Sequence, residues 1–399
     1  MRRGLRIARQ MTMRVIQRTT RVAAILVAMA SLIQGCAGIR LDRALSETPY
    51  DWLTFGGAAS RVNQSGSVVP PPLQAVWEYN ALAGIRGTPL VKDSVVLVVT
   101  LNGEIQAVHL TTGERIGYMV LESAVAGTPV WDDSFAYVAC ALGSETLTCI
   151  GLRNAERRWA RDYGSIESSL LLHGELLYVT TLDGILYCIK KSDGSELWKF
   201  ETAEKEKRKP IRSSPASDGA VIAFGSDDAY IYAVDRTGGR LRWKHQTGAS
   251  IFATPVIAHD VCIVGSLDGF VYALQMSNGQ LLWKHDTRSR IYAAAAEADS
   301  VVYIGSADGR LHALRIDTGT RLWSFSAGSV ISSAPLVAGD VLYVGSLDRT
   351  LYALNRHTGE KLWQYEAPGR IRVSPVIWGD VLLLTSEDKF ITAMRPAQP

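Results

Sequence analysis

One acidic residue recurs along the chain in a single sequence context, and a carboxylate could act there as a general base or a calcium ligand. It follows a mostly apolar segment and, in three of four copies, precedes Gly; the copies are Asp183, Asp268, Asp308 and Asp348. Asp and Gly together favour the tight turn of a β-hairpin. Because the acid repeats at the same turn, we interpret these aspartates as structural.

No other group of residues has the spacing of a catalytic or metal site. The sequence has no His-x-x-x-His pair, calcium loop or phosphate-binding glycine loop, and its seven histidines are scattered. The cysteines after Cys36 stand where equivalent segments carry small or apolar residues; they are Cys140, Cys149, Cys188 and Cys262. We expect these cysteines to be free buried thiols, and a disulfide between Cys140 and Cys149 is the alternative. We predict no catalytic residue, metal or cofactor.

A second set of equivalent positions varies in residue type. Eight times the chain reads Ile or Val, a variable residue, a mostly small residue, and then mostly Ser or Thr. The variable residues are Arg86, Ala126, Glu167, Arg212, Phe252, Tyr292, Ser332 and Arg372. This mixture of cations and aromatics is typical of a partner-docking surface, although a solvated rim is the alternative.

The elements that position these residues repeat about every 40 residues. Residues 331–363 contain four short apolar segments separated by Gly339-Asp340, Leu347-Asp348 and Thr358-Gly359. No segment has the 3.6-residue apolar period of a helix. Four short antiparallel strands in about 40 residues are typical of one blade of a β-propeller.

A tryptophan marks the fourth strand of nearly every repeat. The tryptophans are Trp77, Trp159, Trp198, Trp243, Trp283, Trp323 and Trp363, and Gly117 takes the remaining place. We expect each indole to dock between neighbouring blades. The last repeat lacks a fourth strand, which the segment around Trp77 can supply. We therefore predict an all-β, eight-bladed propeller over residues 75–399, closed by the N-terminal strand around Trp77. At Gly117, Tyr118 or Trp131 is expected to replace the missing indole.

The N-terminal region resembles an export segment. Residues 1–35 contain seven Arg and no acidic residue, and an apolar run over 22–33 leads to Gln34-Gly35-Cys36. This resembles the lipobox of bacterial lipoproteins, which implies a signal peptide over 1–35 and a lipid on Cys36. Residues 36–74 then form a tether. Ala37 rather than Asp after the cysteine implies the outer membrane.

The charge of the remaining chain bears on its partners. Residues 36–399 hold 35 basic and 39 acidic residues, a net charge of −4. A nucleic-acid-binding surface needs a basic stripe. We therefore exclude nucleic acid as a partner.

The segment Ala353-Leu-Asn-Arg-His-Thr-Gly-Glu-Lys-Leu-Trp363 resembles the docking motif of the pyrroloquinoline-quinone (PQQ) repeat superfamily. The superfamily includes PQQ- and calcium-dependent dehydrogenases and non-enzymatic propellers such as the BamB lipoproteins. The dehydrogenases resemble one another in a vicinal Cys-Cys pair and long insertions, and this chain has neither. The resemblance therefore implies a non-enzymatic protein.

The one sizeable insertion lies over residues 201–215, and BamB proteins look similar at this place. In them an apolar-Arg element before Ser-x-Pro contacts the barrel-forming BamA subunit, and Ile211 and Arg212 would correspond here. This chain lacks their longer fourth-blade loop, and a solvated charged loop is the alternative.

The resemblance implies a lipid-anchored, BamB-like scaffold at the periplasmic face of the outer membrane, a monomer within a complex with a BamA-like protein. Candidate partner contacts are Ile211, Arg212, Arg86, Arg372, Phe252 and Tyr292. A quinoprotein dehydrogenase and a propeller that binds a small ligand or polysaccharide remain the alternatives.

Overall fold

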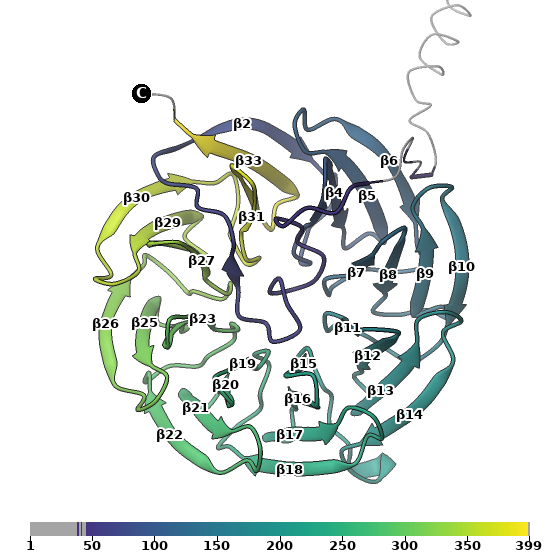
Figure 1. The fold of residues 1–399 in the computed structure, drawn as a ribbon, viewed down its shortest axis with the longest axis vertical. Coiled ribbons are helices and arrows are strands. Elements are labelled where there is room, and N and C mark those ends of the chain that lie inside the picture. The colour runs from purple at the N-terminus through teal and green to yellow at the C-terminus, as the bar shows by residue number, and fades with distance from the viewer. Residues whose placement is uncertain (1–37, 40, 42–44, 398–399) are drawn as a thin grey trace, which may run out of the picture. The chain divides into compact units, whose positions relative to one another are not determined.

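The computed structural model describes residues 38, 39, 41 and 45–397, and within them the chain forms a ring of eight β-sheets (Figure 1). The predicted all-β, eight-bladed propeller is thereby confirmed. The single helical element in the described part is a 3₁₀ turn, η1 (Lys205–Lys207). No helix there is long and apolar enough to cross a membrane. The predicted signal peptide and the candidate lipid site Cys36 lie outside the described residues.

Each blade is a sheet of four strands, antiparallel from the ring centre outward. Blade 1 contains β3 (Leu90–Lys92), β4 (Val95–Val99), β5 (Glu104–His109) and β6 (Arg115–Val120). Blade 2 contains β7 (Val130–Asp132), β8 (Phe135–Ala139), β9 (Leu147–Gly151) and β10 (Glu156–Arg161). Blade 3 contains β11 (Leu171–His173), β12 (Leu176–Thr180), β13 (Ile185–Lys190) and β14 (Glu196–Glu201). Blade 4 contains β15 (Ala216–Ser217), β16 (Val221–Gly225), β17 (Tyr230–Asp235) and β18 (Leu241–Gln246).

The second half of the ring repeats this order. Blade 5 contains β19 (Val256–Ala258), β20 (Val261–Gly265), β21 (Phe270–Gln275) and β22 (Leu281–Asp286). Blade 6 contains β23 (Ala296–Ala298), β24 (Val301–Gly305), β25 (Arg310–Arg315) and β26 (Arg321–Ser326). Blade 7 contains β27 (Leu336–Ala338), β28 (Val341–Gly345), β29 (Thr350–Asn355) and β30 (Lys361–Glu366). Blade 8 contains β31 (Val376–Trp378), β32 (Val381–Thr385), β33 (Phe390–Pro396) and, as its outer strand, β2 (Leu73–Asn80).

The burial of the strands explains their composition. In the second strand of blade 7, β28, every residue is buried, because both faces pack against neighbouring blades. The outer strand β30 instead alternates between exposed and half-buried residues. Continuous apolar runs are therefore typical of the middle strands, and an alternation of apolar and polar residues is typical of the outer ones.

The tryptophans join each blade to the next. Trp243 pairs with Ala233 across its own blade, and its indole Nε1 donates a hydrogen bond of 2.7 Å to the carbonyl of Met276 in blade 5. The indole lies so close to the turn of that blade that a Cβ on Gly279 would come within 2.6 Å of it. Trp77, Trp159, Trp283 and Trp323 also donate to the following blade, at 2.7–3.0 Å. The tryptophan therefore acts as an inter-blade contact.

Blade 1 lacks this contact, because Gly117 pairs with Ala107 in the place of a tryptophan. Trp131, on the innermost strand of blade 2, is instead 1% exposed and belongs to an apolar cluster with Leu97 and Val99 of blade 1. Its large side chain fills the interface from the channel side. Trp131 thus adds apolar packing between blades 1 and 2 near the channel, while the outer position of the missing indole is held by Gly117.

Residues 50–72, here called the inner segment, cross the centre of the ring before β2 (Figure 1). They include β1 (Gln64–Ser65), which runs parallel to β27. Carbonyl groups of the segment accept hydrogen bonds of 2.9–3.0 Å from the innermost strands of six blades, through the amides of Val91, Trp131, Ser217, Ile257, Glu297 and Val337. A tether over 36–74 is therefore not what the structure shows for residues 50–72, because these backbone bonds fix the segment in the channel.

Arg61 holds the inner segment to blade 3, which makes none of these backbone bonds, and also to blade 4. Its side chain is fully buried; Nε donates to the carbonyl of Pro215 (3.1 Å) and Nη2 to that of Leu170 (2.8 Å). Nη1 donates to Thr54 Oγ1 and to the carbonyl of Phe55. Burial lowers the pKa of Arg61 to about 9, so the guanidinium is still charged at neutral pH.

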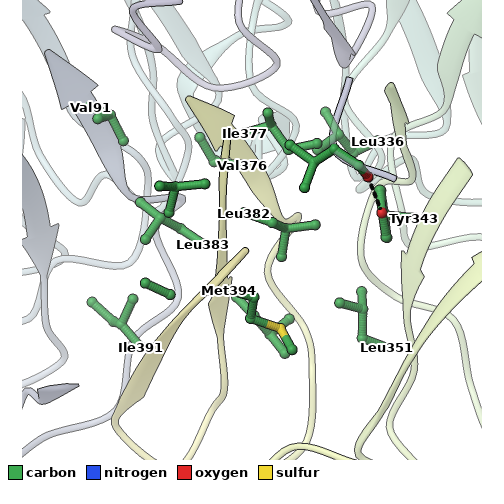
Figure 2. Close-up of a cluster of buried hydrophobic side chains, with 14 of the residues drawn as sticks. Val91, Leu336, Tyr343, Leu351, Val376, Ile377, Leu382, Leu383, Ile391 and Met394 are labelled. Carbon is green, nitrogen blue, oxygen red and sulfur yellow. Dashed lines mark hydrogen bonds between the residues drawn. The ribbon is translucent and has the colours of Figure 1, made fainter. Parts of the chain in front are cut away.

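The largest apolar cluster lies where the ends of the ring meet. It combines Leu382 and Met394 of blade 8 with Leu351 of blade 7 and Val91 of blade 1 (Figure 2). The hydroxyl of Tyr343 donates to the carbonyl of Val69, so the inner segment is also fixed to this cluster. Register in β2 follows the same pattern as in other outer strands, with Trp77 opposite Ala393.

Candidate docking site at the channel mouth

The variable residues lie at one mouth of the channel because the segments that carry them are fixed on both sides. The apolar residue before each is fully buried, as Ile251 and Ile291 are. In blades 2 and 3 the Ser or Thr two positions after the variable residue accepts a hydrogen bond from the previous blade: the amide of Thr88 donates to Thr128 Oγ1 at 2.9 Å, and that of Thr128 to Ser169 Oγ at 3.0 Å. The amide of Ser169 continues the series by donating to Ser214 Oγ at 2.9 Å, so these bonds link blades 1 to 4, whereas blades 6 and 7 carry Ala294 and Ala334 at this position.

A cavity of about 130 Å³ lies inside this mouth. Among the variable residues it is lined by Arg86, Phe252, Tyr292, Ser332 and Arg372. Phe55 of the inner segment also lines it, so the segment limits the depth of the cavity. Arg212 lies beside it through Phe252, whereas Ala126 and Glu167 do not line it. The structure therefore brings together most of the ring that the repeat singled out.

Arg212 is the most highly connected residue of the mouth. Its guanidinium forms an ion pair with Asp227, lies 3.7 Å from Glu167 Oε2 and stands 5.3 Å above the ring of Phe252. Burial raises the pKa of Asp227, and Arg212 opposes that rise. Phe252 in turn contacts Tyr292, with ring centroids 6.3 Å apart. Arg212 and the two aromatic rings thus form one continuous surface.

The other two cations, Arg372 and Arg86, differ in whether they form an ion pair. Arg372 forms an ion pair with Glu387 at 3.0 Å. Arg86 is exposed and makes no ion pair within residues 45–397. Tyr292 is 37% exposed, which leaves its ring available for stacking. Exposed arginine and tyrosine side chains of this kind are common at the centres of protein interfaces.

The prediction that Ile211 contacts a partner is wrong. Ile211 is fully buried in a cluster with Leu171, Tyr178 and Phe224. Its amide donates to the carbonyl of Thr181 at 3.1 Å. The residue is the blade 4 copy of the core position held by Ile251 in blade 5, so it cannot reach a partner without opening the blade.

The charged insertion over 201–215 forms ion pairs within itself and with neighbouring strands and turns. Lys207 lies 3.0 Å from Glu204, and Arg208 lies 3.5 Å from Glu201. The side chain of Arg208 is only 9% exposed, so it packs under the loop instead of facing solvent. Of this insertion, Arg212 is the residue that reaches the mouth.

The recurrent aspartates do what turn residues do. Asp268 Oδ1 accepts the amide of Phe270 at 2.9 Å, and Oδ2 accepts the hydroxyl of Tyr272 and the amide of Gly248, both at 2.7 Å. Within the described part of the chain, no group of three His, Cys, Asp or Glu residues is placed to hold a metal. Cys140 and Cys149 are both buried free thiols.

Phe55 and Arg61 are the site residues that the sequence did not reveal. They lie outside the repeat, so no periodic pattern marks them. The only available signal was the apolar stretch over 51–57, whose Trp52 and Phe55 are unusual in an exposed tether. Their position in the channel depends on contacts with residues more than 100 positions away.

The ring of blades and its tryptophan contacts define an eight-bladed β-propeller of the PQQ-repeat class. Residues 120–200, 192–297 and 268–398 match the family described as outer membrane protein assembly factor BamB, and the chain belongs to this family.

Individual relatives show how far this similarity extends. BamB of Legionella pneumophila (strain Paris) is 27% identical over 182 residues, which are 43% of this chain and 46% of that protein. The chain thus spans about half the length of the curated relatives it matches. The crystal structure of BamB from Moraxella catarrhalis superimposes with a TM-score of 0.70 and 19% identity, covering 81% of this chain and 99% of that one. The crystal structure of quinohemoprotein alcohol dehydrogenase from Comamonas testosteroni superimposes with a TM-score of 0.75 and 14% identity, covering 89% of this chain and 82% of that one. At these identities the two structures show the fold alone.

Proposed function

We propose that this protein is a non-enzymatic docking propeller that takes part in the assembly of outer-membrane β-barrel proteins. Membership of the BamB family over residues 120–398 carries the proposal. The continuous surface of Arg212, Phe252 and Tyr292 at the channel mouth is where we place the partner contact. The partner would be a large outer-membrane β-barrel assembly protein of the BamA kind.

The dehydrogenase alternative fits the channel poorly. Cofactor pockets generally measure about 300–1000 Å³, whereas the mouth cavity measures about 130 Å³. No Asp or Glu lines that cavity, so it has no carboxylate with which to hold a calcium ion. The inner segment, fixed by Arg61, occupies the space below it. We therefore derive no step through a quinone or calcium.

The test is a pull-down of the tagged protein from cross-linked, detergent-solubilised cell envelopes. We expect the wild type to recover a large outer-membrane β-barrel protein. Arg212→Glu breaks pairs within the propeller, whereas Arg86→Glu reverses a charge that has no pair among residues 45–397. Each should lower the recovery about tenfold or more, because central arginines are often interface hot spots.

Arg153→Glu is the matched control. Arg153 is exposed on the turn between β9 and β10, and successive antiparallel strands place that turn at the face opposite the mouth. We expect this variant to recover the partner as the wild type does. Equal recovery by all three variants, or no β-barrel protein in any sample, would contradict the proposal. Turnover of an alcohol or sugar after titration with PQQ and Ca²⁺ would support the dehydrogenase instead.

We also propose that Cys36 carries a lipid which holds the protein at the periplasmic face of the outer membrane. The lipobox-like Gln34-Gly35-Cys36 sequence supports this. Mass spectrometry of the mature N-terminus should find a diacylated Cys36, and an unmodified later start would refute it.

A further inference from the structure

A repeated aromatic contact links neighbouring blades at the edge of the ring. The residue two positions after the tryptophan meets a tyrosine of the next blade, as Phe325 meets Tyr352 at 5.1 Å between ring centroids. The tyrosine hydroxyl donates to the turn aspartate of its own blade, at 2.7 Å from Tyr352 to Asp348. His245 and Tyr272 repeat this contact between blades 4 and 5. In these blades the polar atom of the buried ring is therefore satisfied.

Between blades 5 and 6 both aromatic residues are histidines. His285 on β22 and His312 on β25 lie edge to face, with ring centroids 5.7 Å apart. His312 is 2% exposed, yet neither of its ring nitrogens has a hydrogen-bond partner within residues 45–397. Nε2 of His285 is likewise unpartnered, while its Nδ1 lies 3.1 Å from the carbonyl of Gly319. The turn aspartate of this blade, Asp308, bonds to Ser306 instead.

His285 and His312 belong to the lining of a cavity of about 470 Å³, while their unpartnered nitrogens are themselves buried. It is lined by His285, Asp286, Thr287, Arg288, Arg310, His312 and Arg321. Its three arginines outweigh the single carboxylate of Asp286. Arg310 approaches Asp308 at 3.8 Å, whereas Arg288 and Arg321 form no ion pair in the described part of the chain.

This charge distribution favours an anion over a metal ion. Burial, together with the positive charges of Arg321 and Arg310 and the neighbouring His285, lowers the pKa of His312 to about 4. At neutral pH its imidazole is therefore uncharged and has one N–H to donate. Guanidinium groups bind the oxygens of phosphate in a two-pronged geometry. A divalent cation would instead face the field of three arginines with a single carboxylate near it.

We propose that this cavity between blades 5 and 6 binds a small oxyanion of the phosphate class through Arg310 and Arg321, and that the ring of His312 turns to donate its N–H to the anion. The site is separate from the channel mouth, and it does not depend on the proposed function. The anion is either free phosphate or the phosphate of a lipid headgroup, because both present the same oxygens.

The probe is inorganic phosphate, titrated into the protein with the imidazole proton signals of His285 and His312 followed by NMR. We expect saturable shifts of both signals, at constant ionic strength set with chloride. His312→Tyr introduces the residue found at this position in blades 5 and 7, so the variant should fold normally. It should lower the affinity for phosphate about tenfold or more. Arg321→Gln should weaken it similarly.

His245→Phe is the matched control, because it changes the equivalent aromatic contact one blade earlier and should leave phosphate affinity unchanged. Equal shifts with chloride alone, unchanged affinity in His312→Tyr, or tighter binding of Zn²⁺ than of phosphate would each overturn the proposal. Vesicles of phosphatidylglycerol, but not of phosphatidylcholine, that displace the phosphate would assign the site to a lipid headgroup. Phosphate binding that resists both vesicles would assign it to the free anion.

Discussion

Arg61→Met tests whether the inner segment is a structural part of the propeller. The substitution keeps an unbranched apolar side chain but removes the guanidinium. Three buried carbonyl groups, those of Phe55, Leu170 and Pro215, then lose their donor. The residue is fully buried, so water cannot replace the lost bonds without opening the channel.

The expected loss can be worked out from these contacts. An orphaned buried acceptor costs about 1–3 kcal/mol, and removal of one partner from a buried charged network costs about 3–5 kcal/mol. The desolvation of Arg61, visible in its lowered pKa, offsets part of the sum over three carbonyls. We expect the free energy for releasing the inner segment to fall by about 3–5 kcal/mol.

Amide hydrogen exchange measured by mass spectrometry is the appropriate assay, because it reports local opening as well as global unfolding. Amides over residues 52–65 should lose protection by about 100-fold or more, since each 1.4 kcal/mol is a factor of ten. Peptides of the outer strands, such as β22, should change much less. Arg153→Met, which alters an exposed arginine, is the control. Protection over 52–65 within threefold of the wild type would refute our account of Arg61.

Three further predictions concern the blades. Gly279→Ala should destabilise the protein by about 2–4 kcal/mol in urea unfolding, because its Cβ would meet Trp243 at a position with positive φ. Gly174 also has a positive φ but has open space around it, so the control Gly174→Ala should cost about 1 kcal/mol. Ile211→Ala should lower the free energy of unfolding by about 2–5 kcal/mol, because the residue is fully buried. An unchanged free energy of unfolding would contradict its assignment to the core. The thiols of Cys140, Cys149, Cys188 and Cys262 should resist alkylation at pH 8 until the protein unfolds. The reason is that burial raises the pKa of these thiols, for Cys149 to about 11. Rapid labelling of these thiols in the native protein would contradict this.

Features that recur within each blade were predictable from the sequence. The spacing of the tryptophans predicted eight blades, and the deviations from the repeat identified Arg86, Phe252 and Tyr292 at one mouth. The same register places Ile211 at the position of buried isoleucines in other blades, and Ile211 is buried as they are. At this position the repeat predicts burial correctly, whereas the likeness to a family motif does not.

The histidine pair shows a second limit. In sequence, His285 and His312 are two unremarkable residues 27 positions apart, and the seven histidines of the chain follow no motif. Only the stacking of blade 5 on blade 6 brings the rings together and leaves their nitrogens without partners. A contact between different blades leaves no short-range pattern, so it could not be predicted.

The sequence by itself determined the number of blades, the position of their turns and the residues that repeat or vary. It could do so because each blade is a local unit whose strands and hairpins follow one another within about 40 residues. Only the tertiary structure decided that residues 50–72 occupy the channel and that Phe55 lines the mouth cavity. The physical reason is that Arg61 bonds to carbonyls 109 and 154 residues away, and such partners become neighbours only after the ring has closed.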